Sequence, residues 1–197
     1  TTRVKLDMEG QTTEGALQWL DRQLGQSGLN PASKVTLPYE LPEAVAKLDL
    51  FSAQTASVQL TALAAWFDLA NTVLSDFARN YADLEPGPSP VRCWPHHFDI
   101  ATYVQLEAGS AEAARGIGIG MSPGDESYGQ PYVYVNPWPH LDPADLPDPP
   151  HPGHWHTDGY VGAVATAEQI LTLVDLPDAL LSFVESAFAV GRAGLEA

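Results

Sequence analysis

The stretch Gly116-Ile117-Gly118-Ile119-Gly120-Met121 alternates small and apolar residues, and Tyr132-Val133-Tyr134-Val135-Asn136 alternates again after a Ser122-Pro123-Gly124-Asp125 turn. Successive side chains of a strand point to opposite faces, so the two stretches predict a hairpin with one apolar face. Residues 97–106 alternate in the same way. We therefore expect an antiparallel sheet in the middle of the chain.

Helical patterns flank this strand-rich centre on both sides. Apolar residues recur at spacings of three and four over residues 53–83, which predicts a long helix with one buried stripe. Residues 160–165 predict another strand, Thr166 to Gln169 fits a capping box, and Asp175 is the expected N-cap of a last helix. The fold class expected is α+β: an antiparallel sheet of about four to six strands, with the long N-terminal-half helix and the C-terminal helices packed on one face.

The ends and loops give weaker patterns. We expect short strands at residues 3–7 and 34–37, and between them a helix capped by Thr12 or Thr13. Six prolines between residues 138 and 153 predict a semi-rigid loop rather than a helix or a central strand. Residues 1–197 are expected to form a single domain.

Composition narrows the function classes. The chain has 9 Lys and Arg against 25 Asp and Glu, a net charge of −16. Such a charge disfavours nucleic acid and anionic membrane surfaces as partners, and no run of about 18 apolar residues predicts a membrane span. The single cysteine, Cys93, excludes an internal disulfide, and we expect a buried thiol. A cytoplasmic location is the default expectation.

All six histidines lie between residues 96 and 156, and the pattern suggests a metal site. On strands, His97 would share a face with Asp99, and His154 with His156. Imidazole and carboxylate ligands suit zinc, iron or nickel, so His97, Asp99, His154 and His156 are the candidate metal ligands. The alternative is a core histidine at His96 and a polar loop over residues 151–156.

The polar face of the hairpin is a second candidate site. Glycines on one strand leave a shallow groove, and tyrosines on the next strand can form its sides. A ligand can then approach the backbone closely. The alternative is that the tyrosine rings themselves lie over the glycines. The proline-rich loop would border the opening, and the charge favours a neutral or cationic ligand. The candidate ligand-binding residues are Tyr103, Tyr132, Tyr134 and Asn136.

Three segments carry a resemblance to a known family: residues 94–99 (WPHHFD), 120–125 (GMSPGD) and 131–139 (PYVYVNPWP). They resemble a family of uncharacterised bacterial proteins catalogued as a domain of unknown function. The likeness covers most of the chain, from residues 4–6 to the final helix, and it implies a further β segment ahead of Thr1. It implies a shared fold and no particular chemistry, because none of these motifs is catalytically diagnostic.

Three function classes therefore stay open. The first is a metal-dependent enzyme, a hydrolase or an oxygenase. The second is a non-catalytic small-molecule binding module that uses the tyrosine and glycine face. The third is an interaction domain whose acidic surface meets a basic partner.

Asp125 and Glu126 lie on a turn, where we expect both carboxylates to be solvated. The sequence leaves open whether the protein catalyses a reaction. It also leaves the oligomeric state open.

Overall fold

The computed structural model describes residues 3–31, 50–95, 97–110 and 114–197. The chain forms two compact units, Thr1–Ala62 and Leu63–Ala197. The first unit contains helix α1 (Thr13–Gln26), and helix α3 (Ser57–Asn80) runs from the first unit into the second. The strands of the described residues all belong to the second unit, so any site on their sheet belongs to it as well.

Helix α1 begins as predicted. The Thr12 hydroxyl accepts a hydrogen bond from the backbone N–H of Gly15 at 2.9 Å, which identifies Thr12 as the N-cap. The strand expected at residues 3–7 is absent, since these residues have neither helix nor strand structure. An alternating pattern makes a strand only where a partner strand supplies the hydrogen bonds. The strand expected at residues 34–37 lies outside the described residues.

The second unit is built on a seven-stranded antiparallel sheet, which confirms the predicted class with more strands than expected. The strands are ordered β1-β3-β4-β5-β7-β6, and β2 also pairs with β3. Their bounds are β1 (Gly87–Pro88), β2 (Arg92–Trp94), β3 (Asp99–Gln105), β4 (Gly116–Ser122), β5 (Tyr132–Trp138), β6 (His154–His156) and β7 (Gly162–Thr166). The predicted hairpin is the β4–β5 pair at the centre.

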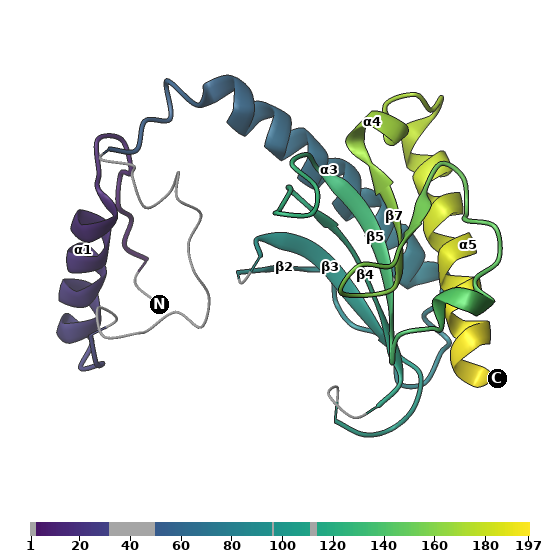
Figure 1. Cartoon of the computed structure of the whole chain (residues 1–197). Coiled ribbons are helices and arrows are strands. Elements are labelled where there is room, and N and C mark those ends of the chain that lie inside the picture. Colours follow the sequence, from purple (N-terminus) through teal and green to yellow (C-terminus); the bar gives the residue numbers. More distant parts are fainter. Residues whose placement is uncertain (1–2, 32–49, 96, 111–113) are drawn as a thin grey trace. The chain divides into compact units, whose positions relative to one another are not determined.

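One face of the sheet is covered by helices, as the sequence predicts. Helices α3 and α5 (Leu176–Glu196) lie along the sheet (Figure 1), and Phe77 of α3 packs edge-to-face on Phe188 of α5 with ring centroids 5.1 Å apart. The even-numbered side chains of β3 and the odd-numbered ones of β4 and β5 fill the core between them: Ile100, Thr102, Val104, Ile117, Ile119, Met121, Val133 and Val135. Burial of each large apolar side chain contributes about 1.5–3 kcal/mol.

The long helix is shorter than residues 53–83, and only its C-terminal half is buried. Ala70, Leu74 and Phe77 of the expected stripe are buried together with Val73, whereas Leu60 is 40% exposed. The buried positions are those that belong to the second unit, because burial depends on a facing sheet as well as on spacing.

The C-terminal helices and the proline-rich loop lie where the sequence predicts them, but some of their local features differ from the prediction. Helix α4 (Ala167–Ile170) has the predicted capping box at Thr166. Helix α5 follows Asp175 as expected, but Asp175 has a φ of 59° and its side chain makes no capping hydrogen bond. The proline-rich loop contains one 3₁₀ turn, Pro143–Asp145. Cys93 is exposed, so the expected buried thiol is wrong: it lies on β2, whose three residues are all exposed.

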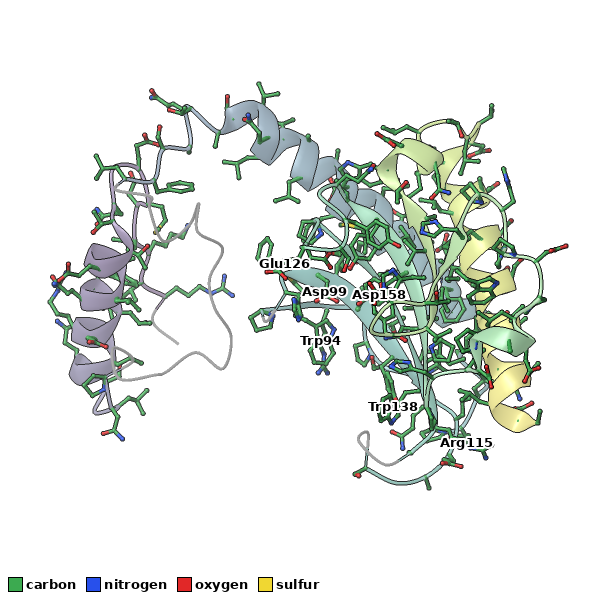
Figure 2. The ribbon with its side chains drawn as sticks, in the orientation of Figure 1. Trp94, Asp99, Arg115, Glu126, Trp138 and Asp158 are labelled. Atoms are coloured by element: carbon green, nitrogen blue, oxygen red, sulfur yellow. The ribbon has the colours of Figure 1, made fainter. Side chains whose placement is uncertain are left out.

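Arg115 ties the start of β4 to the end of α5. Its side chain donates to the Glu107 carboxylate at 3.0 Å and to the backbone carbonyl of Leu195 at 2.5 Å, and its backbone N–H donates to Glu107 at 2.9 Å. These bonds of Arg115 lower the pKa of Glu107, the backbone bond most. Figure 2 shows Arg115 and Trp138 at the same end of the sheet, consistent with the Gly116–Trp138 pairing.

We predict that Arg115→Ala lowers the free energy of unfolding by about 1–2 kcal/mol, because it removes charge-assisted hydrogen bonds at a helix end. Arg192→Ala is the matched control. Arg192 pairs with Glu196 on the exposed side of α5, and its loss costs about 0.3–0.5 kcal/mol. Urea unfolding followed by circular dichroism measures both. Equal losses in the two variants would show that Arg115 contributes nothing beyond a surface ion pair.

Candidate functional site

The candidate side chains share the face of the sheet that the helices leave uncovered. In the register, Ala101 pairs with Gly120, Gly120 with Tyr134, Tyr134 with Val164, and Val164 with His154. Directly paired residues point to the same face, and so do residues two apart on a strand. This face therefore carries Asp99, Tyr103, Tyr132, Tyr134, Asn136, His154 and His156.

A pocket of about 370 Å³ opens on this face. It lies in the second unit, over the ends of β3 and β5 and the loop between β4 and β5. Every side chain that lines it is polar or aromatic: His97, Asp99, Ser122, Asp125, Tyr132, Tyr134, Asn136 and Tyr160. Figure 2 shows Asp99 on the part of the sheet toward Glu126, the residue that follows Asp125 in the loop.

Two carboxylates hold the two central tyrosines. The Tyr134 hydroxyl donates to Asp99 Oδ2, and the Tyr132 hydroxyl donates to Asp125 Oδ2 at 2.5 Å. Asp125 Oδ1 also accepts the backbone N–H groups of Ser127 and Tyr128 at 2.8 and 3.0 Å. Asp125 is exposed, as expected for a turn, but its carboxylate is bound to Tyr132 rather than only to solvent. It fixes the loop and one wall of the pocket together.

The pocket tyrosines are held in their neutral form. Burial, followed by the Asp99 charge, raises the pKa of Tyr134 well above its ordinary value. Burial and the bond to Asp125 raise the pKa of Tyr132, and burial with the Tyr128 and Asp125 charges raises the pKa of Tyr160 to about 12. At neutral pH these hydroxyls are therefore donors, and the negative charge stays on the two carboxylates.

Tyrosine rings cover two of the three glycines of β4. A Cβ at Gly116 would lie 2.1 Å from the Tyr103 hydroxyl oxygen, and one at Gly120 would lie 2.7 Å from Tyr134 Cζ. A Cβ at Gly118 would meet nothing closer than 3.8 Å. At Gly116 and Gly120 the structure therefore shows the alternative in which tyrosine rings lie over the glycines. Only at Gly118 is the backbone of β4 left uncovered.

His154 and His156 both contact the hydroxyl of Tyr128. His154 Nε2 and His156 Nδ1 each lie 2.9 Å from it, and His156 Nε2 lies 2.6 Å from the carbonyl oxygen of Asp158. A carbonyl can only accept, so neutral His156 carries its proton on Nε2 and accepts the Tyr128 proton at Nδ1. His154 then donates from Nε2 to Tyr128. The bonds form one directed chain from His154 to Asp158.

This chain of bonds separates the candidate metal ligands into two pairs. His97 and Asp99 line the pocket, whereas His154 and His156 bind Tyr128, whose ring packs against Tyr132 with centroids 4.9 Å apart. Among the described residues, no three His, Cys, Asp or Glu side chains are placed to hold a metal ion. A metal at this face stays a prediction.

In the part of the chain that the structure describes, two buried side-chain polar atoms lack a hydrogen-bond partner: the hydroxyl of Tyr103 and Oδ1 of Asn136. Leaving a buried polar group unpaired costs about 1–3 kcal/mol. The Asn136 side chain is among those that line the pocket. The Tyr103 hydroxyl lies over Gly116, outside the pocket lining.

Four residues of the site were not among the sequence candidates: Ser122, Asp125, Tyr128 and Tyr160. Ser122 continues the even-numbered alternation of β4, so parity alone could have placed it on this face. Tyr128 lies in the hairpin loop, where no strand periodicity applies. The sequence predicts a strand that begins at residue 160, but β7 begins at Gly162 and Tyr160 lies just before it. Only the folded loops bring Tyr160 to the pocket lining and the Tyr128 ring against Tyr132.

No protein-family model, no curated protein and no solved structure matches the chain. The likeness to a bacterial family of unknown function thus stays a prediction. In the part of the chain that the structure describes, no helix is long and apolar enough to cross a membrane.

We predict that Gly120→Ala destabilises the protein by about 1–3 kcal/mol, because the added methyl group displaces Tyr134 and meets Ala101 at 2.8 Å. Gly118→Ala is the control, since it adds the same group where nothing is closer than 3.8 Å, and its effect should be small. Thermal unfolding measures both. If the two variants have the same melting temperature, the position of the Tyr134 ring does not depend on a glycine at residue 120.

We also predict that stability falls as the pH rises above about 10. The pKa values of Tyr132, Tyr134 and Tyr160 are raised in the folded protein above the ordinary 10.0, so the unfolded chain loses these protons first. Their contribution is complete below 10 and is lost as the pH rises toward the folded-state values. Melting temperatures between about pH 8 and 11 measure the loss.

Tyr134→Phe tests the origin of that loss. This variant is expected to be less stable at neutral pH by about 1–2 kcal/mol, because Asp99 loses its donor, and to lose less stability at alkaline pH. Ultraviolet absorbance should show the pocket tyrosines ionising together with unfolding. An absorbance change near pH 10 that Tyr134→Phe lacks, in a protein that keeps its native circular dichroism, would contradict the assignment.

Proposed function

We propose that this chain is a small-molecule binding module whose ligand, neutral or cationic, occupies the pocket on the uncovered face of the sheet. The observation that carries the proposal is the unpartnered, buried Asn136 Oδ1 in a pocket lined only by polar and aromatic side chains. A buried acceptor without a donor costs stability, and a ligand that supplies the donor accounts for it.

The size and walls of the pocket support this function. A volume of about 370 Å³ lies within the range of sites for small organic molecules, roughly 300–1,000 Å³. Three tyrosine rings supply flat apolar surface, and their hydroxyls and the Ser122 hydroxyl supply directional bonds. The pocket is more polar than most such sites, which favours a ligand with several hydrogen-bonding groups.

The walls are also fixed before any ligand arrives. Asp99 and Asp125 bind the hydroxyls of Tyr134 and Tyr132, and the Tyr134 ring rests over Gly120. Side chains that are already ordered lose little conformational freedom on binding, so more of the contact energy is available for affinity. Tyr128 packs against Tyr132, and its hydroxyl is bound by His154 and His156, which extends this order to β6.

The charge of the lining sets the class of ligand. Two carboxylates lie in the pocket and no Lys or Arg is among its lining residues. An anion would meet uncompensated repulsion there, at a face of a protein whose net charge is −16. Neutral and cationic molecules are therefore the candidates.

The metal-dependent enzyme is the second candidate function. His97 and Asp99 would supply two ligands from the pocket, but His154 and His156 would have to release Tyr128 before they joined them. Metal analysis of protein purified without a histidine tag separates the two functions. One zinc, iron or nickel ion per chain, lost in His97→Ala and His154→Ala, would favour the enzyme.

The binding function predicts a defined footprint in nuclear magnetic resonance titrations with a panel of neutral, cationic and anionic fragments. Backbone amides around Asp99, Ser122 and Tyr134 should shift with neutral or cationic fragments and not with anions. Asp125→Asn should weaken binding about fivefold or more, because it weakens the bond that holds Tyr132. Glu126→Gln is the matched control: it removes the neighbouring charge, which lies outside the pocket lining.

Two outcomes would overturn the proposed function. One is that no fragment of any charge shifts the pocket amides. The other is that Asp125→Asn and Glu126→Gln weaken binding equally, which would show that overall charge matters and the pocket does not.

A further inference from the structure

We propose that the ligand of this pocket is an organic ammonium ion that retains at least one N–H group, with the N–H donated to Asn136 Oδ1 and the positive charge set against Asp99 and the tyrosine rings. The inference rests on the proposed binding function and narrows it from neutral or cationic molecules to one chemical class.

The first argument is the charge that the hydrogen bonds leave in the pocket. Tyr134 and Tyr132 donate to Asp99 and Asp125, and neither tyrosine gives up its proton. A hydroxyl bond stabilises a carboxylate without neutralising it, and a carboxylate can accept further bonds at its other lone pairs. The carboxylates of Asp99 and Asp125 thus stay negative, and among the described residues that line the pocket only His97 can carry positive charge.

The second argument is the arrangement of the rings. Tyr132 and Tyr134 lie with centroids 6.1 Å apart and planes tilted by 52°, and Tyr160 completes the lining. A cation within about 6 Å of the face of such a ring is attracted by its quadrupole. Aromatic faces together with carboxylates attract positive charge by two independent means.

The third argument separates amines from fully alkylated cations. Asn136 Oδ1 is buried and accepts no hydrogen bond from the described residues. As an amide oxygen it can accept a hydrogen bond but cannot donate one. A quaternary ammonium ion has no N–H and would leave this oxygen unpaired, at a cost of about 1–3 kcal/mol. A primary or secondary ammonium ion satisfies Asn136 and carries the charge in the same group.

Three probes of similar shape test the inference by calorimetric titration at neutral pH: benzylamine, benzyltrimethylammonium and benzyl alcohol. Benzylamine should bind about tenfold more tightly than benzyl alcohol, which lacks the charge, and about fivefold more tightly than the trimethyl compound, which lacks the N–H. Added salt should weaken the binding of benzylamine and leave that of benzyl alcohol nearly unchanged.

Asn136→Leu tests the assigned acceptor. It removes the unpaired oxygen, so the variant should melt at or above the temperature of the unaltered protein while it loses the preference for benzylamine over benzyltrimethylammonium. Asn136→Ala removes the same oxygen and adds less bulk. It replaces Asn136→Leu in this test if the leucine side chain prevents folding. Asn136→Asp keeps an acceptor and should keep the preference.

The outcomes distinguish this inference from the function on which it rests. If benzyl alcohol binds in the pocket as tightly as benzylamine, the ammonium assignment fails and the binding function stands. If the trimethyl compound binds best, or if Asn136→Leu keeps the preference, the role of Asn136 fails. If none of the three probes binds, the ammonium assignment fails, and the fragment titration decides the binding function separately.

Discussion

The separation of the two faces of the sheet depends on the glycine–isoleucine alternation of β4. Ile117 and Ile119 are fully buried against the helices, whereas Gly116 and Gly120 on the other face receive the rings of Tyr103 and Tyr134. A side chain at either glycine would displace a tyrosine. The central strand thus anchors the core on one side and sets the position of the pocket wall on the other.

The carboxylates extend this arrangement from the sheet to the loops. Asp99, at the start of β3, binds Tyr134, and Asp125, in the hairpin loop, binds Tyr132 and two backbone N–H groups. Each acidic group is therefore part of the framework and of the pocket lining at once. Because neutral tyrosines are the donors, the framework is built without neutralising its negative charge.

The buried Asn136 oxygen is the observation on which the proposed binding function rests. Folding alone gives no reason for a buried oxygen without a donor, and an apolar residue of similar size would avoid its cost. Polar groups left unpaired in a lined cavity are expected where a ligand completes the bonds. The neighbouring Tyr103 hydroxyl is also unpaired, but it lies over Gly116 and we have no physical account of it.

The sequence by itself determined the fold class and the faces of the strands. Alternation along β3, β4 and β5 placed Asp99, Tyr134 and Asn136 on the polar face, since parity is a local property that no distant contact can reverse without exposing the core. The long helix and the Thr166 capping box were predictable for the same reason: their signals lie within a few turns of chain. Residues 3–7 show the limit, because alternation without a partner strand gives no sheet.

Only the tertiary structure decided which polar residues meet. Parity put His154 and His156 on the same face as Asp99, but the hairpin loop inserts Tyr128, and its hydroxyl binds both imidazoles. Asp125 and Tyr160 reach the pocket from loops, where no periodicity constrains direction. A side chain's face follows from local backbone geometry, whereas its partners depend on how segments distant in sequence pack together.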